Sequence, residues 1–318
     1  MKIFYLVFIF VPAAIVAELL HAPPIVIFVS SAIAIIPVAG VLGSATEELA
    51  GHTGPTLGGL LTSTLGNFAE LVIAGFALKA GLVGLVKASI TGSILGNLLL
   101  VLGAAQLAGG LKYKTQKINP NVAGLNTTLL TVAVIGLVLP ALFYALHPDP
   151  QRVKTVSMSE GVAGLLILGY LLSLVYSMYT HKRLFGETAV ISPHNSTTGW
   201  SLRRSIVILG AAALTIGVLS EILVSATEAA VKRMGLSEMF VGLVLIPIIG
   251  NAAENSSAVL MAMKNRMDLA VGIAVGSSVQ VALVVAPLLV FMGVALGKPM
   301  DLAFTTMEVV SVALAVAV

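Results

Sequence analysis

The chain has 318 residues, of which 58% are hydrophobic and 10% charged, and its mean hydropathy is +1.06. Soluble domains carry roughly 25% charged residues, so this composition excludes a soluble globular protein and predicts a polytopic membrane protein in a lipid bilayer. The net charge is +3 and the chain has no cysteine, which excludes disulfides and thiolate metal sites. No basic patch interleaved with aromatic residues suggests nucleic-acid binding.

Apolar runs between charged or Gly- and Pro-rich segments predict ten membrane-spanning helices. In chain order they lie near residues 3–20, 24–49, 55–80, 83–110, 120–146, 157–180, 202–233, 237–263, 268–296 and 301–318. The first segment, 1–22, could also be a cleaved signal peptide, because it is short and follows a lysine. No clear small-x-small cleavage site closes it, so we interpret it as an N-terminal transmembrane helix.

The distribution of basic residues predicts the orientation. With a cytoplasmic N-terminus, ten of the 17 Lys and Arg residues fall on the cytoplasmic side, which the positive-inside rule favours. The absence of cysteine and of an organelle-targeting segment favours a prokaryotic plasma membrane.

The sequence repeats itself across a central polar stretch, HKRLFGETAVISPHNSTTGW at 181–200. With an offset of 184 residues, GNFAE at 66–70 aligns with GNAAE at 250–254, and Ser93 aligns with Ser277. With an offset of 181, SATEE at 44–48 aligns with SATEA at 225–229. Three motifs in the same order indicate an internal duplication. The predicted organisation is an N-terminal helix (1–22), a first repeat (23–181), a central linker (182–200) and a second repeat (201–318).

The number of helices in a repeat predicts how the two repeats are related. Five predicted helices separate the start of one copy from the start of the other, and an odd number reverses the topology. The expected fold is therefore an all-α, inverted-repeat (5+5 helices) transporter with one extra N-terminal helix, and its binding site is expected near the midplane at the repeat interface. By this count the second repeat is incomplete, and we expect its last helix to be missing from this chain.

The duplicated GNxxE motif carries the candidate ion ligands. Asn67 and Glu70 are three residues apart and so share one helix face, with Ser63 one turn earlier, and Asn251 and Glu254 repeat the spacing. Gly66 and Gly250 weaken the helix beside each asparagine, and Pro247 favours a kink before the second. We therefore expect two broken helices whose freed carbonyls, amides and carboxylates face a ligand.

A charge at the centre of a bilayer costs roughly 2.5–3.5 kcal/mol, and no lysine or arginine lies near the middle of a predicted span to offset Glu70 and Glu254. One divalent cation or two protons would neutralise the pair equally. Carboxylate, amide and carbonyl oxygens suit a hard cation, Ca²⁺ best. The absence of cysteine and of a mid-span histidine argues against zinc or copper. The alternative is a protonated carboxyl that hydrogen bonds inside the bundle.

Other polar residues have weaker assignments. Ser93, Asn97, Ser277 and Gln280 either line the ion site or hydrogen bond between helices as packing contacts. Glu47 and Glu228 lie in the duplicated SATE motif towards predicted helix ends. They either guide protons or ions at an entrance or are hydrated carboxylates without such a role.

The sequence resembles the calcium/proton exchanger (CAX) branch of the calcium/cation antiporter family. The resemblance rests on GNFAELVIAGFALKAG and ITGSILGNLLLVLG, followed by GNAAENSSAVLMAMKNRMDLAVGIAVGSSVQVALVVAPLLV. It implies an eleven-helix cation exchanger fold and alternating access, with Ca²⁺ moved against protons. Carried over by motif, Glu70 and Glu254 would bind Ca²⁺ or protons in turn, lined by Asn67, Asn251, Ser93, Asn97, Ser277 and Gln280. Transported Ca²⁺ and H⁺ are the expected partners, and no cofactor is expected.

Two departures limit the resemblance. Many members have a histidine after the second motif glutamate, where this chain has Asn255, and the linker has no acidic regulatory helix of the kind that some eukaryotic members carry. The nearest alternative is a sodium/calcium exchanger of the same superfamily, which would be expected to have more hydroxyl ligands. A channel with the same ion site is a further alternative. An intramembrane enzyme is a different class, but HExxH and DxxxD are absent, so we expect no enzyme.

Overall fold

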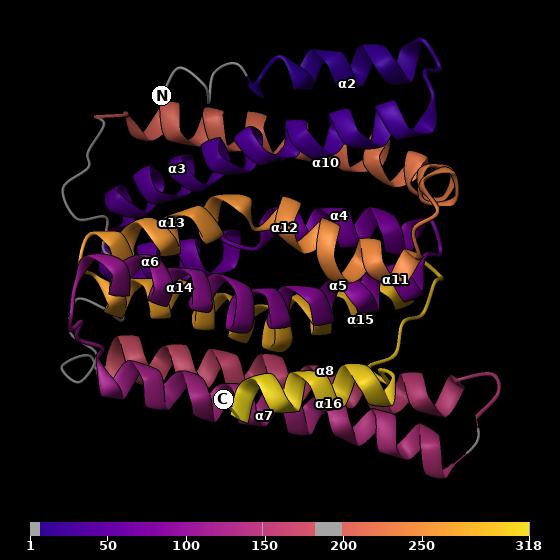
Figure 1. The fold of residues 1–318 in the computed structure, drawn as a ribbon. Helices are drawn as coiled ribbons and strands as arrows, with labels where there is room; N and C mark the ends of the chain where they lie inside the picture. The colour runs from indigo at the N-terminus through magenta and orange to yellow at the C-terminus, as the bar shows by residue number, and fades with distance from the viewer. Residues whose placement is uncertain (1–6, 148, 182–198, 318) are drawn as a thin grey trace. The chain divides into compact units, whose positions relative to one another are not determined.

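A computed structural model describes residues 7–147, 149–181 and 199–317, and every regular element in those ranges is helical (Figure 1). The side chains of residues 54–56, 59, 60 and 63 lie outside the described set. In chain order the elements are α2 (Phe10–Leu19), α3 (Pro24–Leu65), α4 (Phe68–Lys79), α5 (Val83–Leu95), the π-helix η1 (Gly96–Val101), α6 (Leu102–Lys112), α7 (Pro120–Leu146), α8 (Val153–Val175), η2 (Tyr176–Thr180), α10 (Leu202–Met234), α11 (Glu238–Phe240), η3 (Val241–Leu245), α12 (Ile246–Gly250), α13 (Ala252–Met263), α14 (Met267–Gln280), η4 (Val281–Val285), α15 (Ala286–Ala295) and α16 (Thr306–Ala317).

Local chemistry explains where several helices begin and end. The Ser201 hydroxyl accepts a 3.3 Å hydrogen bond from the Arg204 amide at the start of α10, which ends at Gly235 in the left-handed region (φ 67°). Asn119 caps α7 in the same way, with Pro120 at its first position. Gly81, at φ 83°, closes the turn that ends α4. These residues interrupt the apolar runs and divide them into helices.

The chain forms two compact units, one from residues 1–89 and 192–253 and the other from 90–191 and 254–318. Each unit therefore combines helices from before and after the central polar stretch. The division into two sequence repeats remains a prediction, because the compact units do not follow it.

In the first unit, α3 and α10 run side by side along most of their length, and α2 and α12 pack against α3 (Figure 1). Fully buried aliphatic side chains form its core, among them Ile35, Ile73, Ile216, Leu219 and Leu223. Their close packing stabilises the unit through van der Waals contacts.

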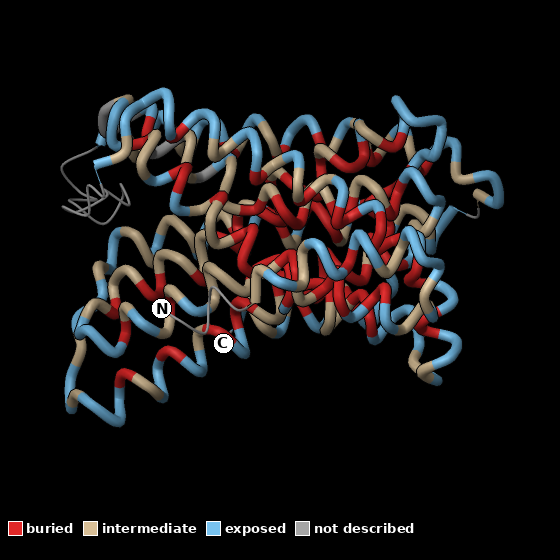
Figure 2. The backbone as a smooth tube through the Cα atoms, turned by 90° about the horizontal axis from the view of Figure 1, so that it is seen from above, coloured by how far each residue is buried: buried red, intermediate tan, exposed pale blue. Residues whose placement is uncertain are grey.

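In the second unit, α7 contacts α8, α14 and α16, while α15 packs against α8 (Figure 1). Figure 2 shows exposed and buried turns alternating along the outer helices. On α8, for example, Leu165 and Leu172 are exposed while Leu166 is buried. Exposed leucines of this kind are what a helix presents to lipid.

Six helices are long and apolar enough to cross a membrane, and a helix pair bent at its break, Glu238–Gly250 with Ala252–Met263, makes up to seven among the described residues. The protein is therefore an integral membrane protein. The expected spans 3–20 and 301–318 appear only as shorter apolar helices, Phe10–Leu19 and Thr306–Ala317.

The expected break between residues 49 and 55 is wrong, because α3 continues as one helix from Pro24 through Pro55 to Leu65. A proline inside a helix removes one backbone donor, so this helix continues past Pro55 with one hydrogen bond fewer. The chain breaks instead at Gly66–Asn67 and at Asn251, which confirms the two broken helices expected at the GNxxE motifs.

Candidate ion-binding site

Glu70 lies in the first unit at the start of α4 and is only 4% exposed. The Nδ2 of Asn251 donates a hydrogen bond of 2.5 Å to its Oε1, although the two residues are 181 positions apart. The glutamate of the first motif is thus bound to the asparagine of the second. The structure thus brings one predicted residue of each motif into contact.

Gly250 allows this approach. A Cβ atom at Gly250 would lie 2.8 Å from the Cγ of Glu70, closer than real Cβ atoms come to a neighbour. The sequence predicts a helix-weakening role for this glycine. The structure adds a steric one, because only a hydrogen leaves room for the carboxylate beside the broken helix.

The two asparagines adopt nearly the same backbone conformation at the two breaks. Asn67 has φ −92° and ψ 20° before α4, and Asn251 has φ −100° and ψ 8° between α12 and α13. Each motif glutamate then lies in the first turn of the following helix. The partial positive charge at a helix N-terminus stabilises a carboxylate there, which offsets part of the cost of burying it.

In the second unit, Glu254 hydrogen bonds with the side chain of Ser277 on α14. Its other oxygen, Oε2, is buried without a hydrogen-bond partner among the described residues, and so is Oδ1 of Asn251 in the first unit. An unsatisfied buried oxygen costs about 1–3 kcal/mol, more when charged. A buried carboxylate oxygen can bind a cation or a proton, and a buried amide oxygen can bind a cation.

The remaining predicted lining residues also lie in the second unit. Ser93, Asn97 and Ser277 are buried, each at most 5% exposed, whereas Gln280 is partly buried. Asn97 is in the π-helix η1, and the corresponding residues of the second repeat, offset by 184, form the π-helix η4. Single π-turns are frequent at functional sites, and the repeated π-turn is consistent with a lining role.

The other predicted residues are more peripheral or fall outside the description. Gly66 ends α3 and is partly buried, as expected for a break, and the side chain of Ser63 lies outside the described set. Glu47 and Glu228 are both exposed, on α3 and α10. The threonines before them, Thr46 and Thr227, are buried and bond to carbonyls of their own helices. An entrance role for these glutamates stays a prediction.

Sequence reasoning missed Ser278, the neighbour of Ser277. Ser278 is fully buried and its hydroxyl lies 3.5 Å from the Ile94 carbonyl of α5 and 3.2 Å from that of Ala274. Of the two serines in GSS at 276–278, Ser277 thus hydrogen bonds with Glu254 and Ser278 contacts α5. The sequence signal that could have identified Ser278 is its position within the repeated segment.

The sequence also does not predict an ion pair between Arg152, just before α8, and Asp301, in the segment between α15 and α16. Arg152 donates a 2.8 Å hydrogen bond to Oδ2 of the buried Asp301, whose other oxygen caps the Ala303 amide. The bond to Asp301 raises the pKa of Arg152. Because 149 positions separate Arg152 from Asp301, their spacing in the sequence does not predict that they pair.

Comparisons with known proteins give the family. A family model for the sodium/calcium exchanger protein matches residues 23–179 and 204–318. A Ca(2+)/H(+) antiporter of Aphanothece halophytica is 43% identical over 326 residues, covering 99% of this chain and 87% of the relative. The Ca(2+)/H(+) antiporter ChaA of Bacillus subtilis is 40% identical over 308 residues, covering 96% and 87%.

A solved structure supports the same assignment for the fold. The structure of native YfkE aligns with 99% of this chain and 89% of its own, with a TM-score of 0.83 and 38% identity. The helical arrangement described above is therefore that of an exchanger of known structure. By sequence and by fold, this chain belongs to the sodium/calcium exchanger protein family.

Proposed function

We propose that this protein is a secondary antiporter that exchanges Ca²⁺ for protons across a membrane by alternating access. The main observation is that the buried carboxylate of Glu70 accepts a hydrogen bond from Asn251 of the other GNxxE motif. The Oδ1 of the same Asn251 is buried without a hydrogen-bond partner among the described residues. Relatives that share 40–43% of its residues bear the name Ca(2+)/H(+) antiporter, which supports the same substrates here.

The oxygen ligands support Ca²⁺ as the cation. Ca²⁺ binds six to eight oxygens of carboxylates, amides and carbonyls, and the described motif residues offer these atoms. Among the described residues, no group of three or more His, Cys, Asp and Glu side chains is arranged to hold a metal ion. We propose Glu70 and Glu254 as the charged ligands, with Asn67, Asn251 and the carbonyls at Gly66 and Gly250 as neutral ones.

Exchange follows from competition for the carboxylates. Ca²⁺ needs both glutamates ionised, whereas protons neutralise them and abolish their attraction for the cation. One Ca²⁺ or two protons leave the same net charge, so the loaded and the protonated protein pay a similar desolvation cost when the site reorients. Ser93, Asn97, Ser277 and Gln280 would line the path, and Glu47 and Glu228 would serve its entrance.

We further propose that the protein resides in a prokaryotic plasma membrane with a cytoplasmic N-terminus. The excess of Lys and Arg on the predicted cytoplasmic side supports this orientation. The two relatives described above are bacterial, which supports the location. We expect a transporter without a resident cofactor rather than an enzyme.

Uptake of radiolabelled Ca²⁺ into proteoliposomes that are acidic inside tests the function. The pH gradient alone should drive uptake, and Glu70→Gln and Glu254→Gln should each abolish it. Glu238→Gln is the matched control, since Glu238 is an exposed carboxylate at the start of α11. Uptake that requires a sodium gradient would instead support sodium/calcium exchange. Uptake that continues without any counter-gradient and does not saturate would support a channel.

A further inference from the structure

The helix that carries Glu254, α13, is held at its far end by side chains from another part of the second unit. The Nε2 of Gln116 donates a 2.8 Å hydrogen bond to the carbonyl of Ala262, and the Nζ of Lys112 donates one of 3.0 Å to the carbonyl of Met263. Both donors come from the end of α6 and the segment after it. They bind two of the last carbonyls of α13, and the Ala262 carbonyl also accepts a 3.1 Å hydrogen bond from the Asn265 amide.

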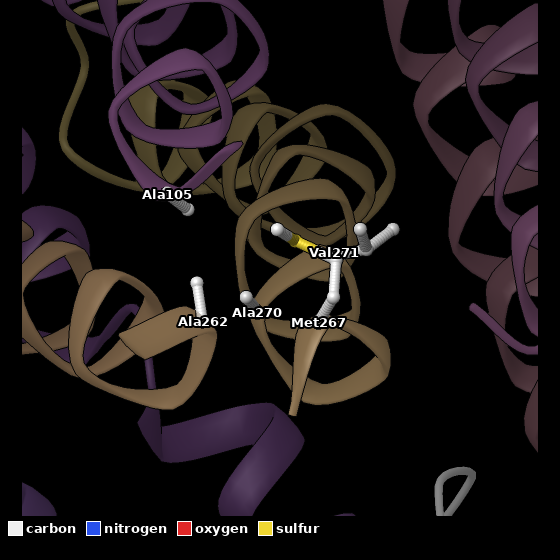
Figure 3. Packing of buried hydrophobic residues seen from close by; sticks show 5 residues of the cluster. All are labelled: Ala105, Ala262, Met267, Ala270 and Val271. Atoms are coloured by element: carbon white, nitrogen blue, oxygen red, sulfur yellow. The ribbon is translucent and has the colours of Figure 1, made fainter. Parts of the chain in front are cut away.

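The packing around this contact is close. Ala105 of α6 lies against Ala262 of α13, and Met267, Ala270 and Val271 of α14 complete the cluster (Figure 3). Three of these five side chains are alanines, so the helices approach each other closely. At Gly109, a Cβ atom would overlap Oε1 of Gln116 and lie 3.1 Å from the Met267 side chain. Gly109 is therefore required for Gln116 to lie where it does.

The charged side chains at the two ends of α13 match the polarity of its helix dipole. Lys112 places a cation at the C-terminal end, where the helix dipole is negative, and Glu254 places a carboxylate in the first turn, where it is positive. At its N-terminal end, α13 is separated from α12 by the break at Asn251.

We infer that Gln116, supported by Lys112 and Gly109, is a positioning residue for Glu254, and this inference rests on the proposed function of that glutamate. A helix is stiff over eight residues, about 12 Å, so fixing the Ala262 carbonyl also fixes the height of Glu254 in the protein. The segment after α6 that carries Gln116 thus sets the position of the Glu254 carboxylate oxygens on α13. In this role Gln116 acts on Glu254 through α13 and is not itself an ion ligand.

The Michaelis constant separates positioning from stability. Gln116→Ala should raise the KM for Ca²⁺ by about five-fold, the equivalent of one hydrogen bond, while the maximal rate per folded protein changes little. A variant that only destabilised the protein would reduce the maximal rate and leave KM unchanged. Gln106→Ala is the matched control, because Gln106 is exposed on α6. An unchanged KM in Gln116→Ala would overturn the inference.

A second pair of variants tests whether a change at Gly109 alters KM through Gln116. Gly109→Ala should raise KM in the same way, because the new methyl group displaces Gln116. In the Gln116→Ala background it should have little further effect, since the overlapping oxygen is gone and the Met267 methyl group, 3.1 Å from the new Cβ, is the end of a flexible side chain that can move aside. Gly110→Ala is the control, as a Cβ there meets nothing within 4 Å. An additive effect of Gly109→Ala in that background would show that Gln116 does not mediate it.

A structural measurement keeps the inference testable if transport fails. The chain has no cysteine, so spin labels can be placed at Leu107→Cys and Leu260→Cys, exposed positions on α6 and α13. Gln116→Ala should broaden the label-to-label distance distribution, and Gln106→Ala should not. A transport-inactive wild type, or an active Glu254→Gln, would contradict the proposed function. An unchanged distance distribution would contradict the positioning role alone.

Discussion

Asn251 donates its side-chain amide to Glu70 at 2.5 Å, which joins the two GNxxE motifs of the chain through one hydrogen bond. The donor orients one carboxylate oxygen of Glu70, while the Oδ1 atom of the same amide is buried without a hydrogen-bond partner among the described residues. One asparagine thereby holds a carboxylate in place and presents an acceptor of its own.

Replacing Asn251 with alanine should weaken Ca²⁺ transport strongly. The substitution removes a hydrogen bond to a charged group, worth about 1.5–3 kcal/mol, and also a candidate ligand oxygen. We expect the KM for Ca²⁺ to rise by roughly ten-fold or more, as measured by proton-driven uptake at several Ca²⁺ concentrations. A KM within two-fold of the wild type would show that this contact does not shape the ion site.

Replacing Gly250 with alanine should impair transport through Glu70. The new methyl group would lie 2.8 Å from Cγ of Glu70, so the carboxylate or the broken helix must shift, at a cost of about 1–3 kcal/mol. We expect a loss of uptake while the protein still elutes as a folded species. Gly272→Ala is the control, because a Cβ on that glycine of α14 has nothing within 4 Å. Equal losses in both variants would contradict the steric explanation.

The Arg152–Asp301 pair should contribute to stability. Asp301 has a side chain only 4% exposed, whereas that of Arg152 is 43% exposed, so removing the arginine leaves a nearly buried carboxylate without its ion-pair partner. Because solvent screens the exposed partner, we expect Arg152→Gln to destabilise the protein by about 1–2 kcal/mol. Thermal unfolding in detergent measures this, with the exposed Arg203→Gln as control. Equal melting temperatures would mean that the pair contributes nothing.

Asp149 should make stability depend on pH in the acidic range. The backbone amide of Thr155 donates to its carboxylate and holds the pKa of Asp149 below its ordinary value. A lowered pKa in the folded protein means that the carboxylate stabilises the fold above the ordinary value, near 3.9. That contribution disappears as the pH falls through the lowered value.

The variant Asp149→Asn isolates this effect, because an amide oxygen can still accept from Thr155 but carries no charge. Its melting temperature should be lower than that of the wild type at pH 6, and the difference should shrink as the solution becomes more acidic than about pH 4. Measurements in detergent across this range provide the check. A difference that is constant with pH would exclude the charge as its cause.

Several features of the fold could be predicted from local patterns. The helix expected at 120–146 is α7 with the same bounds, because an Asn-Pro start and a polar end delimit it. The breaks at Asn67 and Asn251 follow from glycines in long apolar runs. The continuation of α3 past Pro55 could not be predicted in this way, because neighbouring helices can stabilise a helix that its own sequence would interrupt.

From its residues alone, the chain can be recognised as a membrane protein in which two similar motifs each place a glutamate within an apolar run, with oxygen atoms as the candidate ligands. Composition and repeated spacing carry that information, since they do not depend on which helices touch. The contacts of Asn251 with Glu70, of Ser277 with Glu254 and of Gln116 with the end of α13 depend on the fold. Such contacts join residues far apart in the chain, and a hydrogen bond requires its two atoms within about 3 Å, which periodicity cannot specify.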